Sequence, residues 1–543
     1  MLCIIALGVL QGFAYARRPW IGGVATVFAL AVSVLIGIYN NQNPLSWGIT
    51  TLFPSFLLAF GSFFIFKYRK KYIIKGDRLT LPFKIELLTD KNKKLYIEDA
   101  DKGIAIFGAS GSGKSQSVIY SLTQHYAKYH FAGLINDYKD FELTEIAYPL
   151  FRNEKIIFNV FAISDPERSV RINPIAPRFI RTEADVNGRV SAFMINLAGA
   201  VATDDTSSFF NKAAESLLAG VIWRLKEDYP EYCNFPFIIS MLLNPENLHE
   251  KGRPFGKLID FLQKNYRAAL LASTFLTGVG AEKQTAALFS TLSNFLRTLV
   301  TPEVFYLLSA DEYDLALNSA ENRSVLSFVN SPGQKEGIIS PINAMIIEAC
   351  FSEMSKRNCD PAFVLLDEAP TIKLMGLGRR VATLRSYGIS FTYCMQDKIQ
   401  GLAQWGGKDY MTKEVLTNLS TQFMGKVNDP DTARFYENYF EKIEVQQKST
   451  SQKSGWGSGD KRITTSKKEQ SKHRGYEFFR LQAGEFVMFS GGRDIKFRFK
   501  YFKNMEKAKP PVLRVITDEE MERHFNKIIN DAHNLFNKKI VVL

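Results

Sequence analysis

Apolar and polar residues are distributed in two different ways along this chain. The first part carries two long apolar blocks, residues 20–39 and 49–66, and contains no Asp, Glu or Lys before Lys67. Each block is close to the roughly 20 residues that a helix needs to cross a bilayer. We therefore predict a transmembrane anchor of two helices within residues 1–75.

Basic residues flank the two blocks, whereas the connector between them, residues 40–48, is uncharged. Because positive residues are enriched on the cytoplasmic side of membrane helices, the bulk of the chain is predicted to be cytoplasmic. The flanking basic residues are Arg17, Arg18, Lys67, Arg69, Lys70, Lys71 and Lys75. Residues 2–16 are ambiguous, because Ala14-Tyr15-Ala16 resembles a signal-peptidase site and a third, short crossing explains the segment equally well.

Beyond Lys75, short apolar runs alternate with segments of helical period. Buried runs separated by helical segments are typical of a doubly wound α/β fold with one mainly parallel sheet. The runs that we assign to strands are residues 83–87, 94–97, 104–107, 131–136, 324–329, 363–366 and 388–395. Residues 477–500 also show strand-like alternation.

The pattern changes between residues 182 and 318, where long amphipathic stretches replace the short apolar runs. These stretches, residues 209–225, 256–266 and 283–299, predict an all-helical insertion. The α/β part is thereby divided into residues 76–181 and 319–504. A helical tail is expected at residues 505–543, where Thr517-Asp-Glu-Glu520 is a capping box.

A glycine-rich turn, Gly108-Ala-Ser-Gly-Ser-Gly-Lys-Ser115, follows the run 104–107 and matches the phosphate-loop pattern GxxxxGK[ST]. Glycines allow successive amides to curl around a phosphate, and a following helix adds the positive end of its dipole. We expect Lys114 on the β- and γ-phosphates of ATP and Ser115 on Mg²⁺. The predicted nucleotide-binding residues are Gly108, Ala109, Ser110, Gly111, Ser112, Gly113, Lys114, Ser115 and Gln116. A plain Gly/Ser turn is the alternative, and the strand-loop-helix context argues against it.

The run 363–366 ends in Asp367-Glu368, which supplies what the second half of a nucleotide site requires. We predict that Asp367 joins Ser115 around Mg²⁺ and that Glu368 polarises the attacking water. Two acids at the end of an apolar run are often only a strand end. Together with the phosphate loop upstream, they predict an ATPase.

Three further polar residues have two interpretations each. Gln396, at the end of the run 388–395, is either a γ-phosphate sensor or a polar strand cap. Arg385 is either an arginine finger that a neighbouring subunit supplies or a surface arginine. Asp137, at the end of the run 131–136, is either a ligand at the sheet edge or a turn residue.

The amino-acid composition constrains the function less than the pattern of apolar and polar residues does. The 543 residues are 46% hydrophobic, which excludes a disordered protein, and the net charge of +13 favours an anionic partner, either DNA or lipid. The five cysteines are scattered without a CxxC motif, so we expect reduced thiols and no zinc site. Residues 446–474 are rich in Ser, Thr, Gly, Lys and Arg, with a lone Trp456, and predict a mobile basic loop that either contacts nucleic acid or is merely solvated.

The order of these parts resembles the coupling ATPases of conjugation and type IV secretion. The most specific block runs from Asp367-Glu368 through Leu384-Arg-Ser-Tyr-Gly388 to Met395-Gln396 and Gly401-Leu402. The resemblance covers most of residues 20–500 and matches Lys114, Ser115, Asp367 and Glu368 to the family's nucleotide site, Gln396 to its sensing glutamine and Arg385 to its trans-acting arginine. Asp137-Tyr-Lys-Asp-Phe-Glu142 is similar to the family's Asp-x-Lys-Gly-Glu stretch but lacks its glycine.

This resemblance implies a RecA-like phosphate-loop NTPase core with an inserted all-α domain and a multi-pass anchor in the bacterial inner membrane. It also implies a homo-hexamer that uses ATP and Mg²⁺ to recruit a relaxase-DNA complex and drive it through a type IV secretion channel. Two alternatives share the same ATP site: an FtsK- or HerA-like translocase of double-stranded DNA, and a coupling protein for protein effectors. A membrane scaffold with a degenerate nucleotide site is disfavoured, because the nucleotide-site residues are all present.

Overall fold

The computed structural model describes residues 82–197, 205–279, 282–331, 336–405, 409–452, 461–500, 502 and 505–537. The two predicted transmembrane blocks and residues 2–16 lie outside these ranges, so the anchor stays a prediction. Within the described ranges, no helix is both long enough and apolar enough to cross a membrane. Phe83–Leu543 cluster into one unit.

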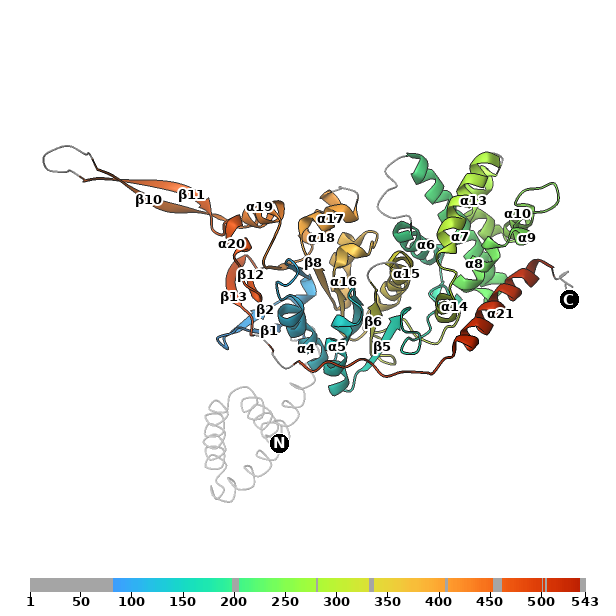
Figure 1. Cartoon of the computed structure of the whole chain (residues 1–543), viewed down its shortest axis with the longest axis horizontal. Helices are drawn as coiled ribbons and strands as arrows, with labels where there is room; N and C mark the ends of the chain where they lie inside the picture. Colours follow the sequence, from blue (N-terminus) through green and yellow to red (C-terminus); the bar gives the residue numbers. More distant parts are fainter. Residues whose placement is uncertain are drawn as a thin grey trace, which may run out of the picture. The chain divides into compact units, whose positions relative to one another are not determined.

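A nine-stranded sheet organises this unit (Figure 1), with the strand order β13-β12-β9-β3-β8-β7-β4-β6-β5. The strands from β9 to β5 are parallel, and β12 and β13 are antiparallel to their neighbours. The strands are β3 (Ile104–Phe107), β4 (Ala132–Asp137), β5 (Ile157–Ala162), β6 (Ser324–Val329), β7 (Ala362–Leu366), β8 (Ile389–Met395), β9 (Thr421–Met424), β12 (Glu485–Ser490) and β13 (Arg493–Arg498). The predicted α/β fold with a large, mainly parallel sheet is confirmed.

Strand β8 lies between β3 and β7, and this position brings the predicted site together. Its register pairs Met395 with Phe107 and Tyr393 with Leu366. All three strands are parallel, so their carboxyl ends lie at one edge of the sheet. The phosphate loop, Asp367 and Gln396 therefore leave the sheet at the same edge.

Each face of the sheet packs against its own set of helices. Ile104, Ile106, Phe363 and Leu365 belong to the core that includes α4 (Tyr120–Lys128), α5 (Glu142–Asn153) and the hairpin of β1 (Ile85–Leu88) and β2 (Lys94–Ile97). The intervening residues of the same strands belong to a second core with α15 (Glu336–Met354) and α16 (Leu377–Leu384). This alternation is what a sheet buried on both faces requires.

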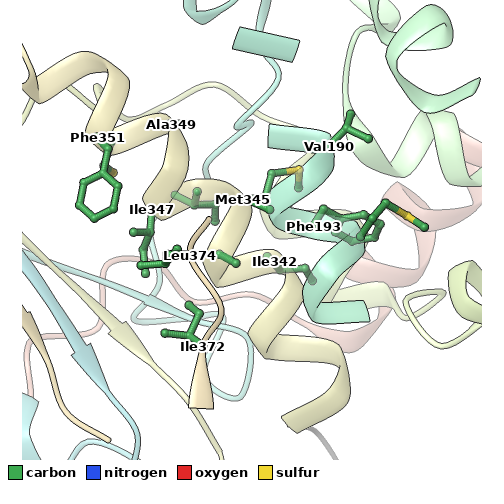
Figure 2. Packing of buried hydrophobic residues seen from close by; sticks show 14 of the residues in the cluster. Val190, Phe193, Ile342, Met345, Ile347, Ala349, Phe351, Ile372 and Leu374 are labelled. Atoms are coloured by element: carbon green, nitrogen blue, oxygen red, sulfur yellow. The ribbon is translucent and has the colours of Figure 1, made fainter. Parts of the chain in front are cut away.

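The chain between β5 and β6 forms helices, as the amphipathic pattern predicts. They are α6 (Glu183–Leu197), α7 (Asp205–Asp228), α8 (Phe235–Leu243), α9 (Pro245–Leu248), α10 (Gly256–Gln263), α11 (Tyr266–Leu271), α12 (Ser273–Gly278), α13 (Glu282–Arg297) and α14 (Pro302–Leu308). Helix α6 packs on α15 through Phe193, Ile342 and Met345 (Figure 2). The Asn196 amide also bonds both backbone groups of Lys373, at 2.8 Å each. The helical insertion thus contacts the segment that follows Glu368.

The structure corrects the prediction of a loop at residues 446–474. Two strands, β10 (Lys442–Gln452) and β11 (Lys461–Ser471), pair in antiparallel register from Lys442↔Ser471 to Gln452↔Lys461. They form a separate two-stranded sheet, which Figure 1 draws running out from α19 (Pro430–Tyr439) and α20 (Gly475–Phe479). The described side chains at the base of this ribbon are mostly exposed, so no apolar alternation marks the two strands in the sequence.

The tail after β13 includes the predicted helix, α21 (Asp518–Asn537). This helix returns to the helical insertion, where the Phe525 and Phe305 rings lie 4.7 Å apart and Ser309 bonds His524 at 2.7 Å. The remaining helices of the second α/β part are α17 (Lys398–Gln404) and α18 (Asp409–Thr417). The domain boundaries at residues 182, 318 and 504 stay predictions.

Candidate nucleotide site

The phosphate loop has the backbone that the motif predicts. Gly111 and Gly113 adopt φ values of +75° and +88°, which residues with a Cβ rarely adopt. Gly108 is needed for a different reason, because a Cβ there would lie 2.5 Å from the Ser112 hydroxyl oxygen. The loop residues 109–117 line a cavity of about 840 Å³.

Neighbouring strand ends hold this loop in place. The Ala109 amide donates to the Lys426 carbonyl at 2.7 Å, just after β9. The Gly484 amide, just before β12, donates to the Ser112 carbonyl at 2.9 Å. A Cβ on Gly113 would lie only 2.8 Å from the Gly484 nitrogen, so the two backbones approach closely. The loop is therefore preformed by its surroundings.

Lys114 is 7% exposed, and its side chain turns back into the loop. Its ammonium group donates to the Gly108 carbonyl at 2.5 Å and lies 3.9 Å from the Glu368 carboxylate. The helix that begins at Ser115 opens with a π-helical turn, Ser115–Ile119, before α4. Ser115 is partly exposed and lines the cavity.

Glu368 is the most constrained residue of the site. It is 1% exposed and adopts a left-handed backbone with φ of +46°, a strained conformation for a residue with a side chain. Gln396 donates to its Oε1 at 2.8 Å, whereas Oε2 is buried without a hydrogen-bond partner. A buried carboxylate oxygen without a partner is costly, so Oε2 has the capacity to accept a hydrogen bond from a bound molecule such as water.

Asp367 carries a raised proton affinity. Burial, followed by repulsion from Glu368 and Asp137, raises the pKa of Asp367 to about 7. Its backbone amide donates to the Asn136 carbonyl at 3.0 Å, which fixes it against β4. A buried carboxylate near another carboxylate suits a divalent cation, since the cation offsets the repulsion. The glycine-rich loop, the lysine and the paired acids together fit ATP and Mg²⁺.

We expect Asp367→Asn to stabilise the nucleotide-free protein at alkaline pH. The folded pKa lies above the ordinary 3.8, so the contribution of Asp367 to stability is fully present below pH 3.8 and is lost as pH rises through 7. Removing the buried charge should raise the free energy of unfolding by about 2 kcal/mol at pH 8. Melting temperatures at pH 8 and pH 5 check this, and the gain should shrink at pH 5.

Asp140→Asn is the matched control, because this neighbouring carboxylate is exposed. Its melting temperature should stay close to that of the unaltered chain at both pH values. An equal melting temperature for Asp367→Asn and the unaltered chain at pH 8 would contradict the raised pKa.

Arg385 lies at the other edge of the sheet. It precedes β8, whereas Gln396 follows it, so the seven residues of β8 separate Arg385 from the phosphate edge. At roughly 3.3 Å per residue this amounts to about 23 Å. Arg385 is half-exposed and its Nε donates to Asp101 at 3.1 Å. It cannot reach a nucleotide on its own phosphate loop.

Comparison with known families gives a match in the part of the chain that holds Glu368, Arg385 and Gln396. Residues 361–475 match the family model described as the TraM recognition site of TraD and TraG. In this stretch the chain is TraG/TraD-like. The predicted resemblance to the coupling proteins is thus confirmed. No curated protein matches the sequence.

Solved structures show the same fold at low sequence identity. The bacterial conjugative coupling protein TrwBΔN70, in an unbound form, has a TM-score of 0.58 and 14% identity, over 80% of this chain and 93% of its own. TrwB with ADP and Mg²⁺ has a TM-score of 0.57 and 15% identity, over 76% and 87% of the two chains. TrwB with the ATP analogue ADPNP has the same TM-score and identity, over 76% and 89%.

The stretch Asp137-Tyr-Lys-Asp-Phe-Glu142 lies outside the matched residues and lacks the glycine of the pattern that it resembles, and its backbone shows how it manages without one. Asp140 and Phe141 adopt φ values of +43° and +68°, so this loop takes up a left-handed backbone without glycine. Asp137 accepts bonds from the Thr144 amide and hydroxyl at 2.7 Å and from the Lys139 amide at 3.1 Å. Of the two interpretations of Asp137, the turn residue fits.

Four charged residues that the sequence analysis did not assign to the nucleotide site also line the phosphate cavity. Lys139 lies in the loop after β4 and Glu142 is the first residue of α5, whereas Arg498 is the last residue of β13 and Lys500 follows it. The sequence contained a signal for Lys139 and Glu142, because both belong to the Asp137 to Glu142 stretch that is similar to the Asp-x-Lys-Gly-Glu pattern. Nothing local marks the second pair, which reaches the cavity only because β13 lies at the sheet edge beside β12.

Proposed function

We propose that this protein is a membrane-anchored ATPase that couples a relaxase-DNA complex to a type IV secretion channel. The observation that carries the proposal is the convergence of Lys114, Glu368 and Gln396 on one another beside a preformed phosphate loop. These groups come from three strands and meet within hydrogen-bond or ion-pair distance. A role in DNA transfer is supported by the family match and by the fold shared with a conjugative coupling protein.

The residues of the site have distinct proposed roles. The phosphate loop, residues 108–116, would hold the phosphates, and Lys114 would leave the Gly108 carbonyl to bind the β- and γ-phosphates. Glu368 would hold the attacking water through its unpartnered oxygen, with Gln396 fixing the carboxylate. Ser115 and Asp367 would hold Mg²⁺, which when bound would neutralise charge on the phosphates. Arg385 would act on the neighbouring subunit's nucleotide in a ring.

The remaining parts of the proposal rest on the sequence and the resemblance. Residues 1–75 would anchor the chain in the bacterial inner membrane, with the α/β and helical parts in the cytoplasm. Two of the similar structures are TrwB bound to ADP and Mg²⁺ and TrwB bound to a non-hydrolysable ATP analogue, which supports the same nucleotide and metal for this chain. The name of the matched family model, a TraM recognition site, supports a protein partner in the DNA-processing complex.

Lys114→Ala tests the nucleotide site. We expect a loss of affinity for a fluorescent ATP analogue of about tenfold or more and a matching loss of phosphate release, because the ammonium group binds phosphate in both ground and transition states. Lys128→Ala, at the exposed end of α4, is the control. Unchanged binding and turnover in Lys114→Ala would place the nucleotide elsewhere.

Cargo is tested separately, by purifying the full chain from its native cells and identifying what co-elutes. A relaxase with DNA supports the proposed role. A secreted effector or a chromosome-segregation partner would instead favour one of the two alternative functions.

A further inference from the structure

The ribbon of β10 and β11 is cationic, polar and paired with no other strand in the described part of the chain. Its two strands carry six lysine or arginine residues and two glutamates, which gives a net charge of +4. Eleven of the 22 residues are Ser, Thr or Gln. At the base, the described side chains of Gln446, Ser466, Lys467 and Lys468 are exposed.

The base of the ribbon is fixed to the sheet. Lys472 donates to Asp494 at 2.7 Å and to Glu441 at 3.2 Å, and His473 bonds Asp494 at 2.8 Å. The Phe440 ring packs 4.8 Å from the His473 ring and 6.3 Å from the Phe489 ring. A two-stranded ribbon alone is marginally stable in water, so this anchoring gives the ribbon a defined root.

The dimensions of the ribbon suit duplex DNA. Eleven residues per strand extend for roughly 36 Å, about one helical turn of B-DNA. The major groove, roughly 12 Å wide, admits a two-stranded β-ribbon. Both strands have an open edge, where backbone amides can add bonds to phosphates beside those from Lys, Arg, Ser, Thr and Gln.

The same composition argues against a protein partner on the strands. Protein interfaces are held by aromatic and apolar anchors in a desolvated centre and are depleted of lysine. The strands offer only Ile443, Val445 and Ile463 as apolar residues. Two of these lie near the root, and Val445 is partly buried there. The charge complementarity is with a polyanion.

We propose that the β10–β11 ribbon is a DNA-binding arm that lies in the groove of duplex DNA outside the ATP site. The inference rests on the proposed function for the presence of DNA, and it adds a DNA contact to that function. The arm holds the duplex through its phosphates, so it contributes affinity without sequence preference.

The test uses the full chain in detergent and a fluorescent 30-base-pair duplex, with anisotropy measured over a range of salt concentrations. The ribbon variant combines Lys448→Gln, Lys461→Gln, Arg462→Gln and Lys467→Gln. The control variant also removes four positive charges, from exposed lysines outside the ribbon, through Lys128→Gln, Lys251→Gln, Lys264→Gln and Lys283→Gln. ATP hydrolysis without DNA should be equal in all three proteins.

The logarithm of the DNA affinity falls linearly with the logarithm of the salt concentration. Removing one ion pair between a basic side chain and a phosphate reduces the magnitude of this slope by about 0.9. For the ribbon variant we expect the magnitude of this slope to fall by about 2 to 4 and the DNA affinity at low salt to fall at least about tenfold. For the control variant we expect little change in either quantity. The opposite change, Gln446→Lys with Ser466→Lys, should strengthen binding and steepen the slope, an effect that misfolding cannot produce.

The possible outcomes distinguish failure of the proposed DNA-binding arm from failure of the proposed function. A ribbon variant with the same slope as the control, in a chain that binds DNA, overturns the arm alone. The arm is also overturned if the ribbon variant keeps its DNA affinity but loses self-association in sedimentation, because the ribbon then binds a second copy. Failure of the unaltered chain to bind any DNA overturns the arm together with the proposed DNA cargo.

Discussion

Glu368→Gln is expected to bind ATP normally and to hydrolyse it about 10²- to 10⁴-fold more slowly, the range that a lost general base produces. The amide keeps the shape of the carboxylate and its bond to Gln396, but it cannot accept a proton from the attacking water. The buried, unpartnered Oε2 is the atom on which this expectation depends. Nucleotide affinity and single-turnover phosphate release measure the two effects separately.

Glu154→Gln, an exposed residue just after α5, is the matched control and should hydrolyse ATP at the normal rate. Normal turnover in Glu368→Gln would mean that another group activates the water. Gln396→Ala should lose less than Glu368→Gln, because Gln396 only positions the carboxylate.

Arg385→Ala is expected to reduce turnover by about 10³-fold while leaving nucleotide affinity nearly unchanged. The structure places Arg385 at the amino edge of the sheet, too far from the phosphate loop of its own chain. If Arg385 contributes to hydrolysis, it does so across a subunit boundary. Turnover per subunit should therefore rise steeply with protein concentration.

Mixing variants tests the direction of this contribution. Lys114→Ala subunits keep Arg385, and Arg385→Ala subunits keep a sound phosphate loop, so mixed oligomers should recover part of the turnover that each variant lacks. Arg379→Ala is the control, because Arg379 lies on α16 close to Arg385 and is 91% exposed. No recovery in verified mixed oligomers would count against a trans role and in favour of a surface arginine bonded to Asp101.

Local patterns in the sequence were enough for most of the central sheet. The runs at β3 and β7 are continuous apolar segments and those at β4, β6 and β8 are mostly apolar, because these strands are buried on both faces. Strands β5 and β9 carry weaker signals. In β5, Asn159 interrupts the run and Ile157 is 57% exposed, and β9 has only four residues, two of them polar. Burial produces the pattern, so strands with a less apolar sequence cannot be predicted from it.

The sequence by itself determined the phosphate loop, the Asp367-Glu368 strand end and the helices of the insertion, because each depends on residues that are close in sequence. Only the tertiary structure decided which residues from distant parts of the chain lie in contact at the nucleotide site. The order β3-β8-β7 brings Gln396 to Glu368, and β12 and β13 carry Gly484 and Arg498 to the phosphate loop. The β10–β11 ribbon was also decided at this level, since its sequence has no apolar alternation and its described side chains are mostly exposed. Contacts between distant segments depend on strand order and register, which no local pattern encodes.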